Sequence, residues 1–283
     1  MDLDTNQPLG TPTWIELAVP DLDAALAFYG AVFGWEFRTA PAEHGRYTNC
    51  LLRGRPVAGI APTDDGGPTE WVVSLATPDV DATVELVRRS GGSLLDGPDD
   101  ALSQGRWAVV RDPVGARFGL WQGRDHVGAQ VVNEPGALVR NDLVTPSPEP
   151  AREFYAAVFD FTLDRNEDMP GFDFTFLRRP DGHEVGGIMG APGATASAWN
   201  TTFEAAGTDE VVQRALDAGG AVPGRGGHAL RPHRHRHRPV RRRVLGDHPT
   251  SGVTFSGLRV RSRASAVAAS GCSRASSPTA ART

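Results

Sequence analysis

The stretch Trp14-Ile-Glu-Leu-Ala-Val-Pro-Asp-Leu-Asp-Ala-Ala-Leu-Ala-Phe-Tyr-Gly-Ala-Val-Phe33 returns in altered form as Arg140-Asn-Asp-Leu-Val-Thr-Pro-Ser-Pro-Glu-Pro-Ala-Arg-Glu-Phe-Tyr-Ala-Ala-Val-Phe159, at an offset of 126 residues. Three more matches follow in the same order at an offset of 128: residues 57–60 with 185–188, Trp71 with Trp199, and Gly91-Gly92 with Gly219-Gly220. Ordered landmarks at nearly one spacing indicate an internal repeat. The sequence therefore predicts two copies of one module of about 115 residues.

Within the first copy, alternation over residues 14–19 predicts a strand, and Asp21 is a suitable N-cap for a helix that ends at Gly34. In the second copy Ser147 with Pro148 is expected to begin the equivalent helix. Further strands are predicted at 47–52, 56–61, 71–76, 107–111 and 117–121, and a second helix at 80–89. These elements give an order of about βαβββαββ per module.

We expect five segments along the chain: an N-terminal tail (1–9), the first module (10–124), a linker (125–135), the second module (136–258) and a disordered tail rich in Arg, Ser and Ala (259–283). The fold class is α+β.

Composition excludes several classes of protein. Hydrophobic residues make up 40% of the chain and charged residues 22%, as in ordinary globular proteins. No apolar run reaches the roughly 18 to 20 residues of a membrane span, and the acidic start, Met1-Asp2-Leu3-Asp4, does not resemble a signal peptide. Two cysteines are too few for a disulfide framework. The prediction is a cytoplasmic protein, as a monomer or homodimer.

Charge is distributed very unevenly. All 29 basic residues are Arg; residues 1–224 hold 16 of them against 33 acidic residues, whereas residues 225–283 hold 13 against the single Asp247. The expected second copy of the strands of 105–121 is replaced by the Arg- and His-rich run 228–243. A shift of reading frame near residue 228 would explain the charge step and the lost repeat together. A basic arm for a polyanion and a His-rich metal tract are the alternatives, and nucleic acid is not the expected partner.

The strand, Pro-Asp and helix ending in Phe-Tyr-x-x-Val-Phe-Gly-Trp, followed by Gly-Arg-x5-Asp-Pro-x-Gly-x-x-Phe-Gly-Leu-Trp, resemble the vicinal oxygen chelate superfamily of glyoxalases, bleomycin-resistance proteins and dioxygenases. Tandem chains of this kind are most similar to actinobacterial members often labelled hydroxylase or glyoxalase-like. The resemblance implies paired βαβββ units whose curved mixed sheets form cups. The second module is expected to be incomplete at its C-terminal end.

In metal-dependent members of that superfamily, a His or Gln on the first strand and a Glu on the last strand hold a divalent ion. The matching positions here are Trp14, Arg140 and Gly119, and none of these side chains offers a lone pair. His44, His126 and His183 read as solvated loop residues. No metal cofactor is therefore expected, although a divalent ion on other residues stays an alternative.

Because side chains alternate along a strand, Trp14, Glu16, Arg140 and Asp142 are expected to share the cup face, with Trp121 as a further lining residue. They would bind a small organic molecule: Trp14 stacks, Arg140 takes an oxyanion, and Glu16 or Asp142 accepts a proton. In the opposing interpretation Arg140 pairs with Asp142 or Glu16 as a buried ion network.

The leading hypothesis is a metal-free protein that binds a small molecule, of the glyoxalase or bleomycin-resistance type. The alternative is a lyase, isomerase or oxygenase in which Glu16 and Asp142 do acid–base catalysis. A third interpretation is an inactive scaffold.

Overall fold

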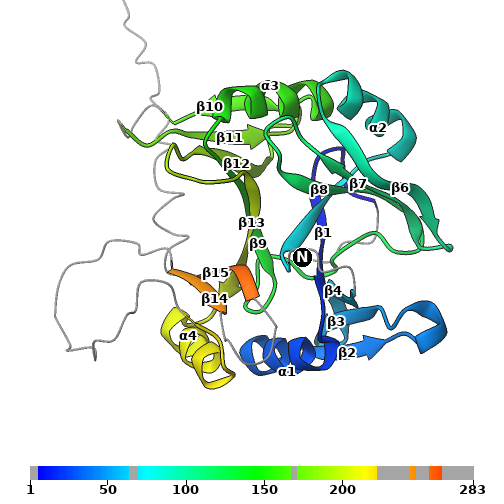
Figure 1. Ribbon diagram of the computed structural model, residues 1–283, viewed down its shortest axis with the longest axis vertical. Coiled ribbons are helices and arrows are strands. Elements are labelled where there is room, and N and C mark those ends of the chain that lie inside the picture. Colours follow the sequence, from blue (N-terminus) through cyan, green and yellow to red (C-terminus); the bar gives the residue numbers. More distant parts are fainter. Residues whose placement is uncertain (1–5, 64–68, 167–170, 222–241, 247–254, 263–283) are drawn as a thin grey trace, which may run out of the picture.

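The computed structural model describes residues 6–63, 69–166, 171–221, 242–246 and 255–262, the last two stretches by their backbone. It contains two mixed sheets, one for each copy of the repeat, and this confirms the predicted α+β class (Figure 1). No helix in the described ranges is long and apolar enough to cross a membrane.

The first module consists of two βαβββ units. The first unit holds β1 (Pro12–Val19), α1 (Leu22–Phe33), β2 (Glu36–Thr39), β3 (Thr48–Leu52) and β4 (Arg55–Pro62). The second holds β5 (Trp71–Ala76), α2 (Val80–Arg89), β6 (Ser93–Ala101), β7 (Gly105–Arg111) and β8 (Arg117–Gly123). They form one eight-stranded sheet in the order β2-β3-β4-β1-β5-β8-β7-β6, so that β1 and β5 meet in the middle.

The second module repeats this plan with β9 (Leu138–Thr145), α3 (Pro148–Phe159), β10 (Thr162–Arg165), β11 (Phe174–Arg178), β12 (Glu184–Gly190), β13 (Ala198–Ala205) and α4 (Thr208–Asp217). Its sheet runs β10-β11-β12-β9-β13-β15-β14, with β14 at Arg242–Gly246 and β15 at Phe255–Ser262. Strand β15 pairs parallel with β13, as β8 does with β5.

The described part of the second module has seven strands against eight in the first, in line with the expected incomplete C-terminal end. After residue 224 the described backbone forms β14 and β15; β15 pairs with β13, and β14 pairs with β15. Residues 259–262, expected in a disordered tail, belong to β15. A counterpart of β6 does not occur in the described part of the second module. Most of the run 228–243 lies outside the described residues.

Local sequence signals define both ends of the first helix. The Asp21 side chain accepts a hydrogen bond from the Ala24 backbone N–H at 2.9 Å, and Gly34 ends α1 in the left-handed conformation with φ 71°. The second copy differs in detail: Ser147 occupies the N-cap position of α3 but its side chain makes no capping hydrogen bond, and Asp160 takes the left-handed position.

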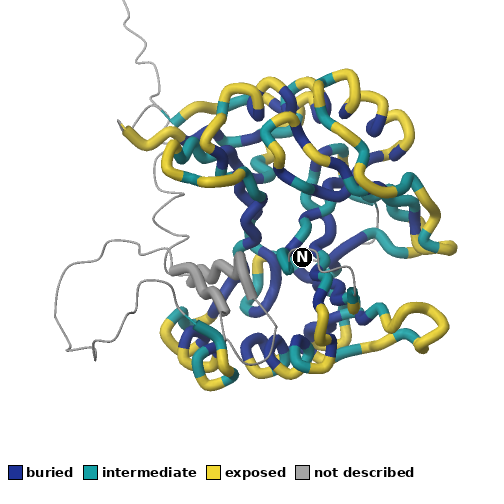
Figure 2. The backbone as a smooth tube through the Cα atoms, in the orientation of Figure 1, coloured by how far each residue is buried: buried dark blue, intermediate teal, exposed yellow. Residues whose placement is uncertain are grey.

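One continuous core joins the two modules. Helix α1 lies beside α4 and α2 lies beside α3 (Figure 1). Strand β5 contacts β13. Figure 2 shows the central strands buried, while the outer turns of the helices and the edge loops are exposed. In each module a Trp indole donates to a Tyr hydroxyl: Trp71 to Tyr29 at 3.1 Å and Trp199 to Tyr155 at 2.7 Å. The Tyr155 hydroxyl donates in turn to Asp112 of the other module at 2.9 Å.

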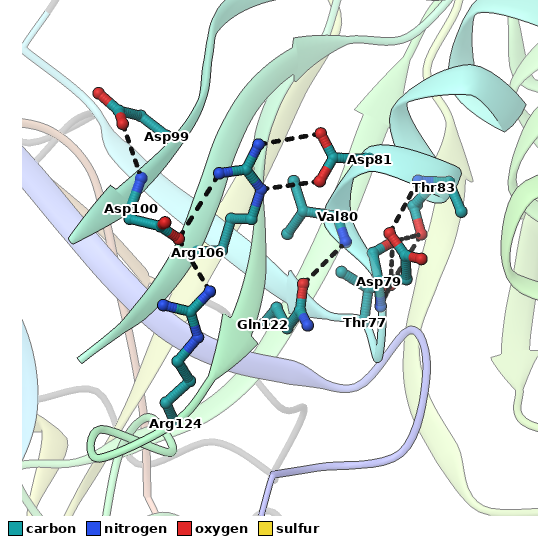
Figure 3. A network of polar contacts seen from close by, with 11 residues as sticks. Thr77, Asp79, Val80, Asp81, Thr83, Asp99, Asp100, Arg106, Gln122 and Arg124 are labelled. Atoms are coloured by element: carbon teal, nitrogen blue, oxygen red, sulfur yellow. Dashed lines mark hydrogen bonds and ion pairs between the residues drawn. The ribbon is translucent and has the colours of Figure 1, made fainter. Parts of the chain in front are cut away.

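A surface network attaches the start of α2 to the edge of the first sheet (Figure 3). Arg106 of β7 donates to both carboxylate oxygens of Asp81 at 2.7 and 3.0 Å, and Arg124 donates to Asp100 at 2.9 Å. The Val80 backbone N–H donates to the Gln122 side chain at 3.2 Å. These contacts hold the outer strands against the helix that covers them.

Candidate functional site

The four predicted residues lie on two different sheets, and the sheet face that carries each pair is called the first cup (Trp14, Glu16) and the second cup (Arg140, Asp142). Strand β1, which carries Trp14 and Glu16, pairs with β4 and β5 of its own module. Strand β9, which carries Arg140 and Asp142, pairs with β12 and β13. The expectation that all four side chains share one cup is therefore wrong. The physical reason is that each copy of the repeat already contains two βαβββ units, and their first strands pair with one another inside the module.

The first cup contains a chain of hydrogen bonds. The Trp14 indole N–H donates to the Tyr47 hydroxyl at 3.0 Å, and that hydroxyl donates to Oε2 of Glu16 at 2.9 Å. Burial raises the pKa of Glu16, against the opposing effects of the Tyr47 hydrogen bond and the Arg117 charge. Burial and the adjacent Glu16 charge raise the pKa of Tyr47 well above its usual range. Tyr47 is therefore a fixed donor, and Glu16 is a carboxylate held ready to accept a further proton.

Aromatic rings form one wall of this cup. His126 packs edge-on against Trp14, with ring centroids 4.5 Å apart, and lies 5.7 Å from Trp121. The Trp121 indole N–H donates to the His126 carbonyl at 2.9 Å. His126 was expected to be a solvated loop residue. That expectation is wrong, because the segment after β8 folds back onto the sheet through the His126 N–H, which donates to the Gln104 carbonyl. Burial lowers the pKa of His126.

Arg117 is a site residue that sequence reasoning missed. It begins β8, and it lies close enough to Glu16 and Glu70 for its charge to lower the pKa of both carboxyls against the effect of burial. Its buried Nε has no hydrogen-bond partner in the described part of the chain. A signal was available: Arg117 lies two residues before Gly119, a position already assigned to the cup face, and period two places both on the same face.

The residues of the first cup do not fit a metal centre of the superfamily type. Trp14 lies opposite Ser74 on β5, and Ser74 lies opposite Gly119 on β8, so three neighbouring strands bring together an indole, a hydroxyl and a glycine. A side chain at Gly119 would begin 2.2 Å from the Ser74 Oγ, which leaves no room for a ligand there. The described residues contain no group of three His, Cys, Asp or Glu side chains suited to a metal ion. We therefore derive no chemistry from a metal.

The second cup is dominated by an ion network. Arg140 Nε donates to both oxygens of Asp142 at 2.7 and 2.9 Å, and its Nη1 donates to Glu184. The Asp142 side chain is 4% exposed and that of Arg140 is 18% exposed. Phe174 and Phe176 flank the guanidinium at 5.4 and 5.8 Å. Arg140 thus pairs with Asp142, as the ion-network interpretation describes, and Glu16 lies in the other module.

Comparison with known proteins agrees with the family resemblance seen in the sequence. A family model for the Glyoxalase/Bleomycin resistance protein/Dioxygenase superfamily matches residues 11–120. The chain is 37% identical over 220 residues to a protein named as a glyoxylase, CFP32, of Mycobacterium tuberculosis, covering 75% of this chain and 84% of that one. It is 32% identical over 230 residues to the anthracycline biosynthesis protein DnrV of Streptomyces peucetius, covering 75% and 83%.

Two solved structures show the same fold. The Mn(II)-bound glyoxalase from Novosphingobium aromaticivorans superposes with a TM-score of 0.55 at 18% sequence identity, over 90% of this chain and 82% of that one. The halotolerant catechol dioxygenase BphC gives 0.52 at 15% identity, over 90% and 86%. With its repeated βαβββ units, its signature motifs and these relatives, the chain belongs to the glyoxalase/bleomycin resistance protein/dioxygenase superfamily.

Proposed function

We propose that this protein binds a small organic molecule in the cup of the first module and that it does so without a metal ion. The observation that carries the proposal is the Trp14–Tyr47–Glu16 chain beside the indole of Trp121. It occupies the part of the sheet where the first-strand metal ligand of other superfamily members would lie. An organic ligand would be held by ring stacking and by hydrogen bonds to Glu16, as is usual for mostly apolar pockets with a few placed polar groups.

The names of the relatives support an organic ligand of moderate size. CFP32 is named as a glyoxylase and DnrV as an anthracycline biosynthesis protein. The ligand expected for this chain is accordingly a planar compound that stacks on Trp121 and presents a hydrogen-bond donor to Glu16. Trp14 is buried and serves to position Tyr47. Asp142, the other acidic residue predicted to bind ligand, is held by Arg140 in the second cup and is not part of this proposal.

The test is a ligand screen on the metal-stripped protein. A panel of planar aromatic compounds is measured by thermal shift and the hits by calorimetry, because a ligand that binds only the folded state raises its stability. We expect hits whose affinity falls at least tenfold in Trp121→Ala and in Glu16→Gln. Phe176→Ala is the matched control, since it removes an aromatic ring from the second cup and should leave the affinity unchanged. Hits that need added metal, or that bind Trp121→Ala as well as the parent, would contradict the proposal.

A second candidate is catalysis by Glu16. A carboxyl with a raised pKa beside a fixed tyrosine donor is an arrangement suited to proton transfer. A lyase, isomerase or oxygenase of this kind would convert a screened hit, and Glu16→Gln would stop turnover while the compound still bound. Binding without conversion of any hit favours the first proposal, and the absence of any hit favours an inactive scaffold.

A further inference from the structure

We propose that Arg111 and Arg117 form a binding site for a carboxylate group, so that the ligand of the first cup is an organic acid. This inference rests on the proposed function, because it names the chemical class of that ligand. It comes from two arginines in the first sheet that lie opposite one another and form no ion pair with a described residue.

The two arginines lie directly opposite one another on neighbouring strands. Arg111 ends β7 and Arg117 begins β8, and the two are paired in the antiparallel ladder. Like charges in this position repel and destabilise a sheet. A guanidinium stays protonated, so the repulsion persists over the ordinary pH range. Solvent screens it in part, because Arg111 is exposed, and an anion bound beside both groups would remove it.

Neither arginine forms an ion pair within the described part of the protein, although the charge of Arg117 acts at longer range on Glu16 and Glu70. Ion pairs hold several other arginines, including Arg106 to Asp81 and Arg124 to Asp100. Arg111 and Arg117 form no such pair among the described residues, and Nε of Arg117 is buried without a hydrogen bond there. A buried donor on a charged group is costly when it is left unpaired. The pair therefore has the features of a site that a ligand completes.

A pocket of about 400 Å³ adjoins this pair at the junction of the modules. Its first-module wall includes Arg111, Arg117 and Glu70, and Ser197 and Ala198 close it from the second module. The charge of Arg117 reaches Glu16 as well as Glu70, so the pocket and the Trp14–Tyr47–Glu16 chain share one electrostatic environment. A carboxylate in the pocket would receive paired N–H donors from a guanidinium fork, which matches its geometry.

Two acidic residues of the pocket affect how strongly an anion binds. Asp96 is exposed, and its carboxylate accepts from the Gly97 backbone N–H at 2.9 Å. Glu70 is half-buried, and burial raises its pKa although Arg117 opposes the shift. An ionised Glu70 would repel a bound carboxylate. Removing this charge by Glu70→Gln should therefore strengthen carboxylate binding several-fold, which is the opposite of what the loss of a structural contact would cause.

The experiment compares benzoate with benzamide, a neutral molecule of nearly the same shape, by calorimetry or NMR titration of the whole chain. We expect benzoate to bind at least tenfold more tightly than benzamide. The difference should vanish in Arg117→Gln and shrink about threefold in Arg111→Gln. Arg89→Gln, which removes one charge from an exposed position at the end of α2, is the matched control and should keep the difference. Circular dichroism verifies that each variant is folded.

The outcomes separate this inference from the proposed function. Equal affinity for benzoate and benzamide, or a benzoate preference that survives in Arg117→Gln, overturns the carboxylate site and leaves the aromatic-ligand screen to decide the proposed function. Binding of inorganic phosphate in preference to acetate and benzoate also overturns the assignment to carboxylates. Benzoate binding that is lost in Arg117→Gln, with no hit among the neutral compounds of the aromatic panel, supports the anion site and contradicts a ligand held by stacking and by Glu16.

Discussion

The Tyr47 hydroxyl lies directly over the Cα of Gly59: a Cβ built on that glycine would come within 2.0 Å of the hydroxyl oxygen and 3.2 Å of the Trp14 indole nitrogen. Gly59 faces Glu16 across the β1–β4 ladder. The absence of a side chain at this position therefore makes room for the whole Trp14–Tyr47–Glu16 chain.

We expect Gly59→Ala to displace Tyr47 and to break both hydrogen bonds of the chain. Overpacking of a filled site costs about 1 to 3 kcal/mol of unfolding free energy, measured by urea denaturation. The affinity of the first cup for its ligand should also fall in Gly59→Ala. Gly193→Ala is the matched control, because a Cβ at Gly193 meets nothing within 4 Å. A Gly59→Ala protein with parental stability and an unchanged tryptophan spectrum would contradict this account.

The sequence predicted most of the fold because the repeat and the helix caps are local signals. Strand β5 and helices α1 and α2 lie where alternation, Asp21 and Gly34 placed them. The short strand β2 and the long strand β6 were missed. Both are edge strands with exposed side chains, and β6 contains Gly97 and Pro98, so neither shows the period-two apolar pattern that marks a buried strand.

The site was predictable only in part. Period two correctly placed Trp14 and Glu16 on one face of β1, but no local pattern shows which strands become neighbours in a sheet. The sequence therefore could not show that Arg140 belongs to a different cup. Tyr47 and His126 were missed for a related reason, because both lie just outside regular strands and reach the cup through contacts that are distant in sequence.

Removing Arg140 should destabilise the protein strongly. Arg140→Ala removes the ion pair of the buried Asp142 carboxylate, and the loss of one partner of a buried pair costs about 3 kcal/mol. Unfolding curves of Arg140→Ala, Asp142→Leu and the double variant Arg140→Met/Asp142→Leu measure the coupling. The double variant should be more stable than Arg140→Ala, since it removes both charges together. If Arg140→Ala unfolds like the parent, the network does not stabilise the second module.

The unfolding free energy should depend on pH in the way that the raised pKa of Glu16 predicts. Burial raises the pKa of Glu16 above the ordinary value of 4.5, so the folded state binds this proton more tightly than the unfolded state. Stability from this group is therefore greatest below pH 4.5 and is lost as the pH rises through the raised pKa. We expect the unfolding free energy of the parent minus that of Glu16→Gln to decrease from acidic to neutral pH. Tyr47→Phe should steepen this decrease, because the hydroxyl stabilises the charged form. A difference that is constant with pH would contradict the burial of Glu16.

Purified protein should contain less than one equivalent of Fe, Mn, Ni or Zn. Trp14, Ser74 and Gly119, which lie side by side on three strands, do not provide a set of metal ligands. Elemental analysis should be done on a variant with glutamine in place of His228, His233, His235, His237 and His248, because the His-rich run could hold Ni or Zn without any role for the cup. One tightly held ion per chain that is lost in Glu16→Gln would contradict the metal-free proposal.

A chain read in the shifted frame from residue 228 onward should be more stable than the present one. In the first module β7 and β8 alternate apolar and polar residues, and Ala108, Val110, Phe118 and Leu120 are buried. If the frame is shifted, we expect the restored residues to show this pattern at the places of β14 and β15. Two strands that alternate in this way would bury several hundred Å² of apolar surface, which at roughly 25 cal/mol per Å² amounts to several kcal/mol. Urea denaturation of the two chains measures the difference, and limited trypsin digestion of the present chain should cut at its arginines after residue 224. Equal stability, together with resistance to trypsin through Arg243, would show that the arginine-rich frame is the one that builds the second sheet.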